Sequence, residues 1–145
     1  MKNRIYEYLL EKHNIEEILT WNEFNLQEKL ERQAFLEVQW REKYISANKK
    51  LEDFKRRKIE IEGEIFMEVR FPHLVDNNKN RYANVGAGID KKEFEKYILP
   101  QDERIKKINK EIELQEIITD FYLTVYESLK RNAWNMKNWV DINRR

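Results

Sequence analysis

The sequence predicts a mostly all-α protein in which long helices form a helical hairpin or bundle. Glycine occurs three times and proline twice in 145 residues, well below the roughly 7% and 5% of average proteins. Few residues therefore interrupt helices, and apolar residues recur at steps of three and four over two long stretches. Because 41% of the residues are hydrophobic, the chain can bury a core. We expect one helical domain over residues 1–145, with a short loop or a small β-hairpin inserted in its middle.

The first long helix is expected over residues 20–65. Thr20 and Glu23 have the spacing of a capping box, in which each side chain bonds a free backbone N–H at a helix start. Further along, apolar residues alternate steps of four and three, the heptad pattern of a helix that buries one seam against another helix. The seam positions are Trp40, Tyr44, Ala47, Leu51, Phe54, Lys58, Ile61 and Ile65, and only the lysine breaks the pattern.

Residues 66–90 interrupt the helical pattern. The first six of them partly alternate and stop at Pro72, and turn-forming residues follow. The segment is therefore either a small β-hairpin or a loop. Asp90 and Glu93 again have capping spacing, which predicts a short helix over residues 91–99.

The second long helix is expected over residues 101–142, opening near Pro100, with Asp102 and Glu103 suited to its first turn. Two apolar stripes lie side by side on it, so its apolar arc is wider than the usual 100° or so. It is either the central helix of a monomeric bundle or a helix whose second face contacts a neighbouring subunit, and we favour the subunit contact. The main seam is Ile105, Ile108, Ile112, Gln115, Thr119, Tyr122, Tyr126, Leu129, Ala133, Met136 and Val140, and the second stripe is Leu114, Ile117, Ile118, Phe121 and Val125.

The net charge of +1 conceals a segregation of charge along the chain. Residues 41–58 hold eight basic and three acidic side chains, a net +5, and residues 59–68 hold four acidic side chains and no basic one. The basic block is either a solvated helix face or a contact for phosphates. Lys79, Arg81 and Tyr82 combine cations with a ring that could stack on a base, as in proteins that bind single strands without sequence preference.

The C-terminal stretch from Lys130 to Trp139 mixes cations and tryptophans in the same way. For Trp134 and Trp139, packing in the core or between subunits is the preferred interpretation, and base stacking is the alternative.

Several classes of function are not favoured by the residues. Cysteine is absent, which excludes disulfides and thiolate metal sites. The two histidines lie sixty positions apart, at His13 and His73, without metal-ligand spacing, so we expect no metal, no cofactor and no enzymatic activity. No apolar run approaches the roughly 20 residues of a membrane span or forms a signal peptide. We therefore expect a soluble, cytoplasmic protein.

Residues 35–142 resemble the UvsY family, the recombination mediators of large tailed bacteriophages. The clearest part is Phe94-Glu-Lys-Tyr-Ile-Leu-Pro-Gln-Asp-Glu-Arg, followed by an apolar helix from Ile112 to Leu129 and by Lys130-Arg131. Upstream, the family's tryptophan and basic residues at the start of its second helical segment are similar to Trp40, Lys43, Tyr44, Lys49 and Lys50.

The resemblance implies a non-enzymatic protein of a phage-infected bacterial cell that binds single-stranded DNA. It also implies ring-like homo-oligomers, heptamers where known, that assemble through the C-terminal helix. Family members contact a RecA-like recombinase and the phage single-strand DNA-binding protein, and they help the recombinase displace the latter. A coiled-coil scaffold that binds no nucleic acid is the alternative function.

The sequence thus gives two sets of candidate residues. The expected DNA-binding residues are Lys49, Lys50, Lys55, Arg56, Arg57, Lys58, Arg70, Lys79, Arg81 and Tyr82. The expected oligomerisation residues are Ile118, Phe121, Tyr122, Val125 and Leu129. On this assignment Phe121→Asp would dissociate the assembly while helicity is retained, because an unpaired charge would enter an apolar contact.

Overall fold

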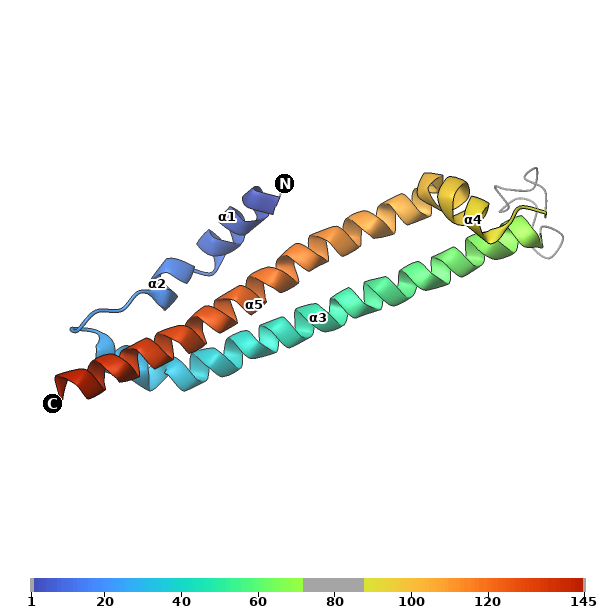
Figure 1. Ribbon diagram of the computed structural model, residues 1–145. Helices are drawn as coiled ribbons and strands as arrows, with labels where there is room; N and C mark the ends of the chain where they lie inside the picture. Colours follow the sequence, from blue (N-terminus) through green and yellow to red (C-terminus); the bar gives the residue numbers. More distant parts are fainter. Residues whose placement is uncertain (1, 72–87, 145) are drawn as a thin grey trace. The chain divides into compact units, whose positions relative to one another are not determined.

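The computed structural model describes residues 2–71 and 88–144, and these residues form helices and connecting turns without a β-strand. The prediction of an all-α protein is therefore confirmed. In the described parts of the chain, no helix has an apolar stretch long enough to cross a membrane. The helices are α1 (Lys2–Lys12), α2 (Ile15–Leu19), α3 (Leu26–Arg70), α4 (Lys91–Glu93) and α5 (Glu103–Asn143); a π-helical turn (Phe94–Ile98) and a 3-10 turn (Leu99–Gln101) lie between the last two (Figure 1).

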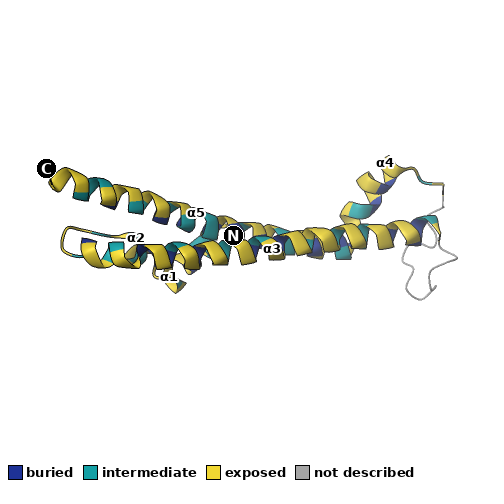
Figure 2. Ribbon diagram, turned by 90° about the horizontal axis from the view of Figure 1, so that it is seen from below, coloured by how far each residue is buried: buried dark blue, intermediate teal, exposed yellow. Residues whose placement is uncertain are grey.

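The chain divides into two compact units, which share the two long helices. Unit 1 consists of Met1–Leu51 and Leu114–Arg145, and unit 2 consists of Glu52–Glu113. In Figure 2 the buried residues of α3 and α5 form narrow bands, while exposed residues cover most of each helix surface.

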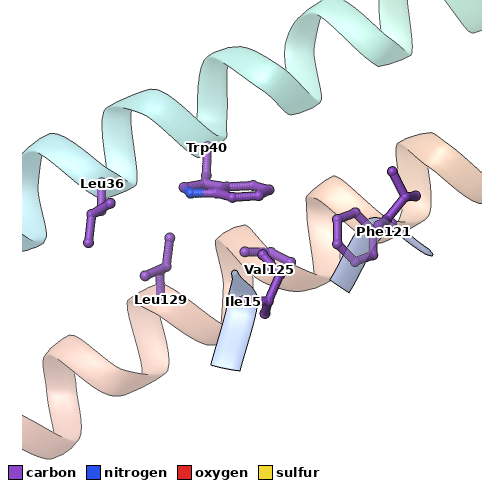
Figure 3. Packing of buried hydrophobic residues seen from close by; sticks show 7 residues of the cluster. Ile15, Leu36, Trp40, Phe121, Val125 and Leu129 are labelled. Atoms are coloured by element: carbon purple, nitrogen blue, oxygen red, sulfur yellow. The ribbon is translucent and has the colours of Figure 1, made fainter. Parts of the chain in front are cut away.

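The core of unit 1 lies where α1 and α2 cover α3 and α5. Its buried members come from all four helices, and Figure 3 shows Leu36 and Trp40 of α3 facing Val125 and Leu129 of α5. Ile15 closes the cluster from α2. The full buried set is Leu9, Ile15, Leu36, Trp40, Phe121, Val125 and Leu129.

Two buried glutamines fix the pairing of α3 with α5 in unit 1. Gln33 Nε2 donates a hydrogen bond to the Leu129 carbonyl at 2.8 Å, and Gln115 Nε2 donates to the Ala47 carbonyl at 3.1 Å. The earlier residue of α3, Gln33, thus pairs with the later residue of α5, Leu129, and the later residue of α3, Ala47, pairs with the earlier residue of α5, Gln115. The two helices therefore run antiparallel here. Because a buried amide without a partner is costly, these bonds also oppose sliding of one helix along the other.

The described residues of unit 2 form an apolar core and a largely buried ionic cluster. Arg104 donates to both carboxylate oxygens of Glu68, at 2.7 and 3.0 Å, and to both oxygens of Asp102, at 2.9 and 3.1 Å. Hydrogen bonds to Glu68 and then to Asp102 raise the pKa of Arg104 above its ordinary value. The cluster joins α3 to the start of α5. The core itself contains Ile65, Val69, Phe94, Ile98, Ile105 and Ile108.

The first long helix starts later than the sequence predicts. The helix begins at Leu26, and Thr20 ends α2 instead, where its hydroxyl donates to the Glu16 carbonyl at 2.5 Å. The side-chain oxygen of Asn22 accepts from the backbone N–H groups of Phe24 and Asn25, at 2.8 and 3.1 Å. The prediction that a helix starts with a capping box at Thr20 was therefore wrong, because asparagine side chains hold residues 22–25 in a turn.

The same helix also ends later than predicted. It continues to Arg70, so residues 66–70 are helical and do not belong to the expected hairpin or loop. Of the rest of that segment, residues 71 and 88–90 are not helical, and residues 72–87 lie outside the described residues.

The connection into the second long helix follows the predicted capping more closely. Asp90 Oδ1 accepts from the Glu93 backbone N–H at 2.8 Å, which confirms the cap expected there. The region predicted as one short helix over 91–99 is a succession of α, π and 3-10 turns. Asp102 Oδ1 then accepts from the Arg104 N–H at 2.8 Å and caps α5.

The predicted seams are confirmed by burial. Trp40, Ala47, Leu51 and Ile65 of α3 are buried, and Lys58 at its seam position is half-buried. In α5 the buried seam residues are Ile105, Ile108, Gln115, Thr119, Leu129 and Met136.

Candidate nucleic-acid interface

The expected DNA-binding residues divide into three groups in the structure. Most of the cations on α3 are exposed, whereas Lys58 and Arg70 are half-buried. Lys79, Arg81 and Tyr82 lie outside the described residues. The exposed members are Lys49, Lys50, Lys55, Arg56 and Arg57.

Three of the exposed cations are consecutive residues of unit 2. Lys55 Nζ lies 3.8 Å from a carboxylate oxygen of Glu52, and Arg56 Nη2 lies 3.1 Å from a carboxylate oxygen of Asp53. Both pairs join residues three apart on the same helix and face solvent. Arg57 has neither an ion pair nor a hydrogen bond to any side chain that the structure describes. The surface therefore presents one unpaired guanidinium beside two loosely paired cations.

Lys58 and Arg70 are poorer candidates for phosphate contacts. Lys58 lies on the inward seam of α3, so part of its side chain is covered. The Arg70 guanidinium carbon lies 5.9 Å from the centroid of the Phe66 ring, which occupies one face of its planar group. Phosphates would thus have less access to these two residues than to their exposed neighbours.

In unit 1 a groove runs between α3 and α5, and lysines lie along it. It has a volume of about 620 Å³, and Lys43 and Lys50, one heptad apart, are among its lining residues. The amine of Lys43 lies 5.6 Å from the centroid of the Trp40 ring. The sequence prediction did not include Lys43 among the DNA contacts, although its seven-residue spacing from Lys50 could have indicated that both lie on one side of the helix.

A second groove of unit 1, about 900 Å³ in volume, has the opposite electrostatic character. Four of its lining residues are glutamates, at positions 11, 16, 17 and 28, against Lys29 and Arg32. Such a surface repels a polyanion, so it is a poor candidate for a nucleic-acid contact.

The expected oligomerisation residues are covered by their own chain. Phe121, Val125 and Leu129 are 1%, 3% and 1% exposed, because α1, α2 and α3 pack over them. Ile118 and Tyr122 are half-buried at the edge of the same cluster. Phe121, Val125 and Leu129 therefore have no exposed surface for a second subunit in this structure. The sequence did not show that residues 1–20 would cover them.

The comparisons with known proteins give no match: no family model, no curated protein and no solved structure is significantly similar to this chain. Among the described residues, no three His, Asp or Glu side chains gather so that they could hold one metal ion.

Proposed function

We propose that this protein binds single-stranded DNA and acts as a recombination mediator. In that role it would help a RecA-like recombinase replace the single-strand DNA-binding protein on a coated strand. The resemblance of residues 35–142 to the UvsY family supports the mediator role. The DNA-binding part rests on one observation, the exposure of three consecutive cations, Lys55, Arg56 and Arg57, on α3.

The ion pairs of these cations do not compete strongly with phosphate. Exposed pairs of this kind contribute about 0–1 kcal/mol each, since the charges remain solvated and the side chains lose freedom. A phosphate group can therefore replace Glu52 at Lys55 or Asp53 at Arg56 at little cost. Binding of DNA also releases condensed counterions, which favours association at low salt.

A scaffolding protein without nucleic-acid binding is the alternative. It is favoured by the fact that two of the three cations are already neutralised by carboxylates of their own helix. In that case the basic block only makes the helix soluble.

Titration of labelled oligo-dT at several salt concentrations separates the two functions. We expect binding whose affinity falls as salt rises, and we expect Arg57→Glu to weaken it about tenfold, the effect of losing one charge-assisted hydrogen bond. Arg32→Glu is the matched control, because Arg32 is also an exposed arginine of α3 but lines the acidic groove. If the wild-type protein does not bind at about 50 mM salt, the proposal is wrong.

A second measurement distinguishes a mediator from a protein that only binds DNA. The assembly of a RecA-like filament on a strand coated with single-strand DNA-binding protein is followed over time. A mediator shortens the delay before filament growth, and Arg57→Glu should shorten it less than the wild-type protein does.

We also propose that the protein works as a homo-oligomer, a ring of seven subunits by resemblance to the family. A ring multiplies weak phosphate contacts, because once one subunit has bound, the strand is held close to the others. A chain with a net charge of +1 can then hold a single strand firmly.

A further inference from the structure

Trp134 is a large aromatic side chain on the solvent side of α5. It is 65% exposed, whereas Met136, two positions further on, is 2% exposed. Residues of an α-helix are about 100° apart around the axis, so these two side chains point to nearly opposite sides. The indole is therefore outside the core of its own chain, which excludes one of the two packing roles expected for it, the core, and leaves a subunit contact and base stacking as the other expectations.

Three cations lie within about one helical turn of Trp134, and one of them, Lys130, has its amine 5.2 Å from the centroid of the Tyr126 ring. Lys130, Arg131 and Lys137 lie four positions before, three before and three after Trp134, and such neighbours share one helix face. All three are exposed. Residues 128–140 contain no acidic side chain and carry a net charge of +3, and Glu127 and Asp141 border this stretch.

We infer that this face of α5 is a second contact for single-stranded nucleic acid. One unpaired base stacks on the Trp134 indole, and the neighbouring phosphates contact Arg131 and Lys137. Exposed aromatic rings flanked by cations are the common means of binding single strands without sequence preference, because every base has a flat face. The inference rests on the proposed function, since the ligand is the same, but it uses other residues.

A second copy of the chain is a poorer occupant of this face. Two identical faces would bring three cations of each subunit together around a pair of indoles, and the like charges would repel. A single strand supplies a flat apolar surface for the indole and phosphates for the cations, whose only acidic neighbours on this face are Glu127 and Asp141 at its two ends.

Three variants test the contact by titration with oligo-dT. We expect Trp134→Ala to weaken binding about tenfold, within the range for loss of one stacked base, and Trp134→Phe to retain most of the affinity. Phe24→Ala is the control, because Phe24 is 90% exposed and has no basic residue within four positions on either side. Binding of a DNA duplex should not change in any variant, since its bases are already stacked.

Tryptophan fluorescence supplies a readout that does not depend on affinity. Saturating oligo-dT should quench the wild-type emission, and Trp134→Phe should lose part of that quenching because the stacked indole is gone. Quenching that is the same in both proteins overturns the inference, even if Trp134→Ala fails to fold.

The other outcomes are also decisive. If the wild-type protein binds oligo-dT and Trp134→Ala binds equally well, this contact is wrong and the α3 proposal stands. If Trp134→Ala loses binding together with native mass, the face is a subunit contact and the inference is overturned. If the wild-type protein does not bind at all, the proposed function and this contact fail together.

Discussion

His13 connects the N-terminal helices to the aromatic core of unit 1. Its ring centroid lies 5.2 Å from that of Trp40, 5.9 Å from that of Tyr122 and 6.2 Å from that of Phe121. Its Nε2 atom is buried and has no hydrogen-bond partner among the described residues. Burial lowers the pKa of His13, and the positive charges of Lys43 and Lys12 lower it further. The packing of unit 1 thus favours the neutral imidazole.

We expect unit 1 to lose stability on acidification through His13. Its pKa in the folded protein lies below the unfolded value of about 6.5, so the unfolded chain binds more protons between the two values. The free energy of unfolding should therefore fall as the pH drops below about 6.5, until the folded-state pKa is passed. Denaturant unfolding measured from neutral to mildly acidic pH should show this loss in the wild-type protein.

The matched variant for this experiment is His13→Gln. Glutamine cannot titrate. The unfolding free energy of the wild-type protein should therefore fall relative to that of the variant as the pH drops below about 6.5. A constant difference over this range would show that His13 carries no part of the acid sensitivity.

At the scale of elements, α1 and α2 cover the part of the wide apolar arc of α5 that α3 leaves open. The sequence predicts most of this arc, although Leu114 of its second stripe is 42% exposed, and it assigns the second face to another subunit. Residues 1–20 carry only short apolar patterns, and isolated helices of that length are marginal in water. Their helices depend on contact with α3 and α5, which is why local pattern alone did not predict them.

Leu9→Asp should release α1 from the rest of unit 1. Leu9 is 6% exposed, and a carboxylate in its place would be buried without a partner, at a cost of about 2–4 kcal/mol. Limited proteolysis should then cleave the first 25 residues much faster than in the wild-type protein. Tyr8→Asp is the control, because Tyr8 is 61% exposed on the same helix and should have no effect. Equal cleavage rates in both variants would mean that α1 is not held by this contact.

At the scale of the whole molecule, the helical periodicity was the most informative part of the sequence. It predicted the inward positions of α3 and α5, because a helix that packs on another helix must repeat its apolar residues at that spacing. It did not predict the division into two units, since the seam continues past Leu51 and Glu52 without a proline or glycine. The candidate DNA contacts were only partly predictable, because a sequence gives the position of a side chain along a helix but not how exposed it is. This holds for the cations Lys58 and Arg70 and for the indole of Trp134.

Because Phe121 is buried within its own chain, we expect a homo-oligomer to assemble through another face. Among the large hydrophobic side chains that remain exposed in unit 1, Phe35, Val38 and Ile45 lie on α3 at spacings of three and seven. That spacing places them on one helix face, and the buried residues Leu36, Trp40 and Ala47 lie on another. A subunit contact of a homo-oligomer would cover this outer face rather than Phe121.

Native mass measurement tests this placement. The double variant Val38→Asp and Ile45→Asp should have a lower native mass than the wild-type protein and unchanged helicity, because it introduces charge into a contact between subunits. Phe121→Asp should instead unfold unit 1, since it places a charge in the core at a cost of about 4 kcal/mol or more. Tyr97→Asp, at an exposed aromatic residue of unit 2, should leave the mass unchanged. A wild-type mass of one chain would refute the homo-oligomer, whereas an oligomer that the double variant leaves intact would refute only the contact through α3.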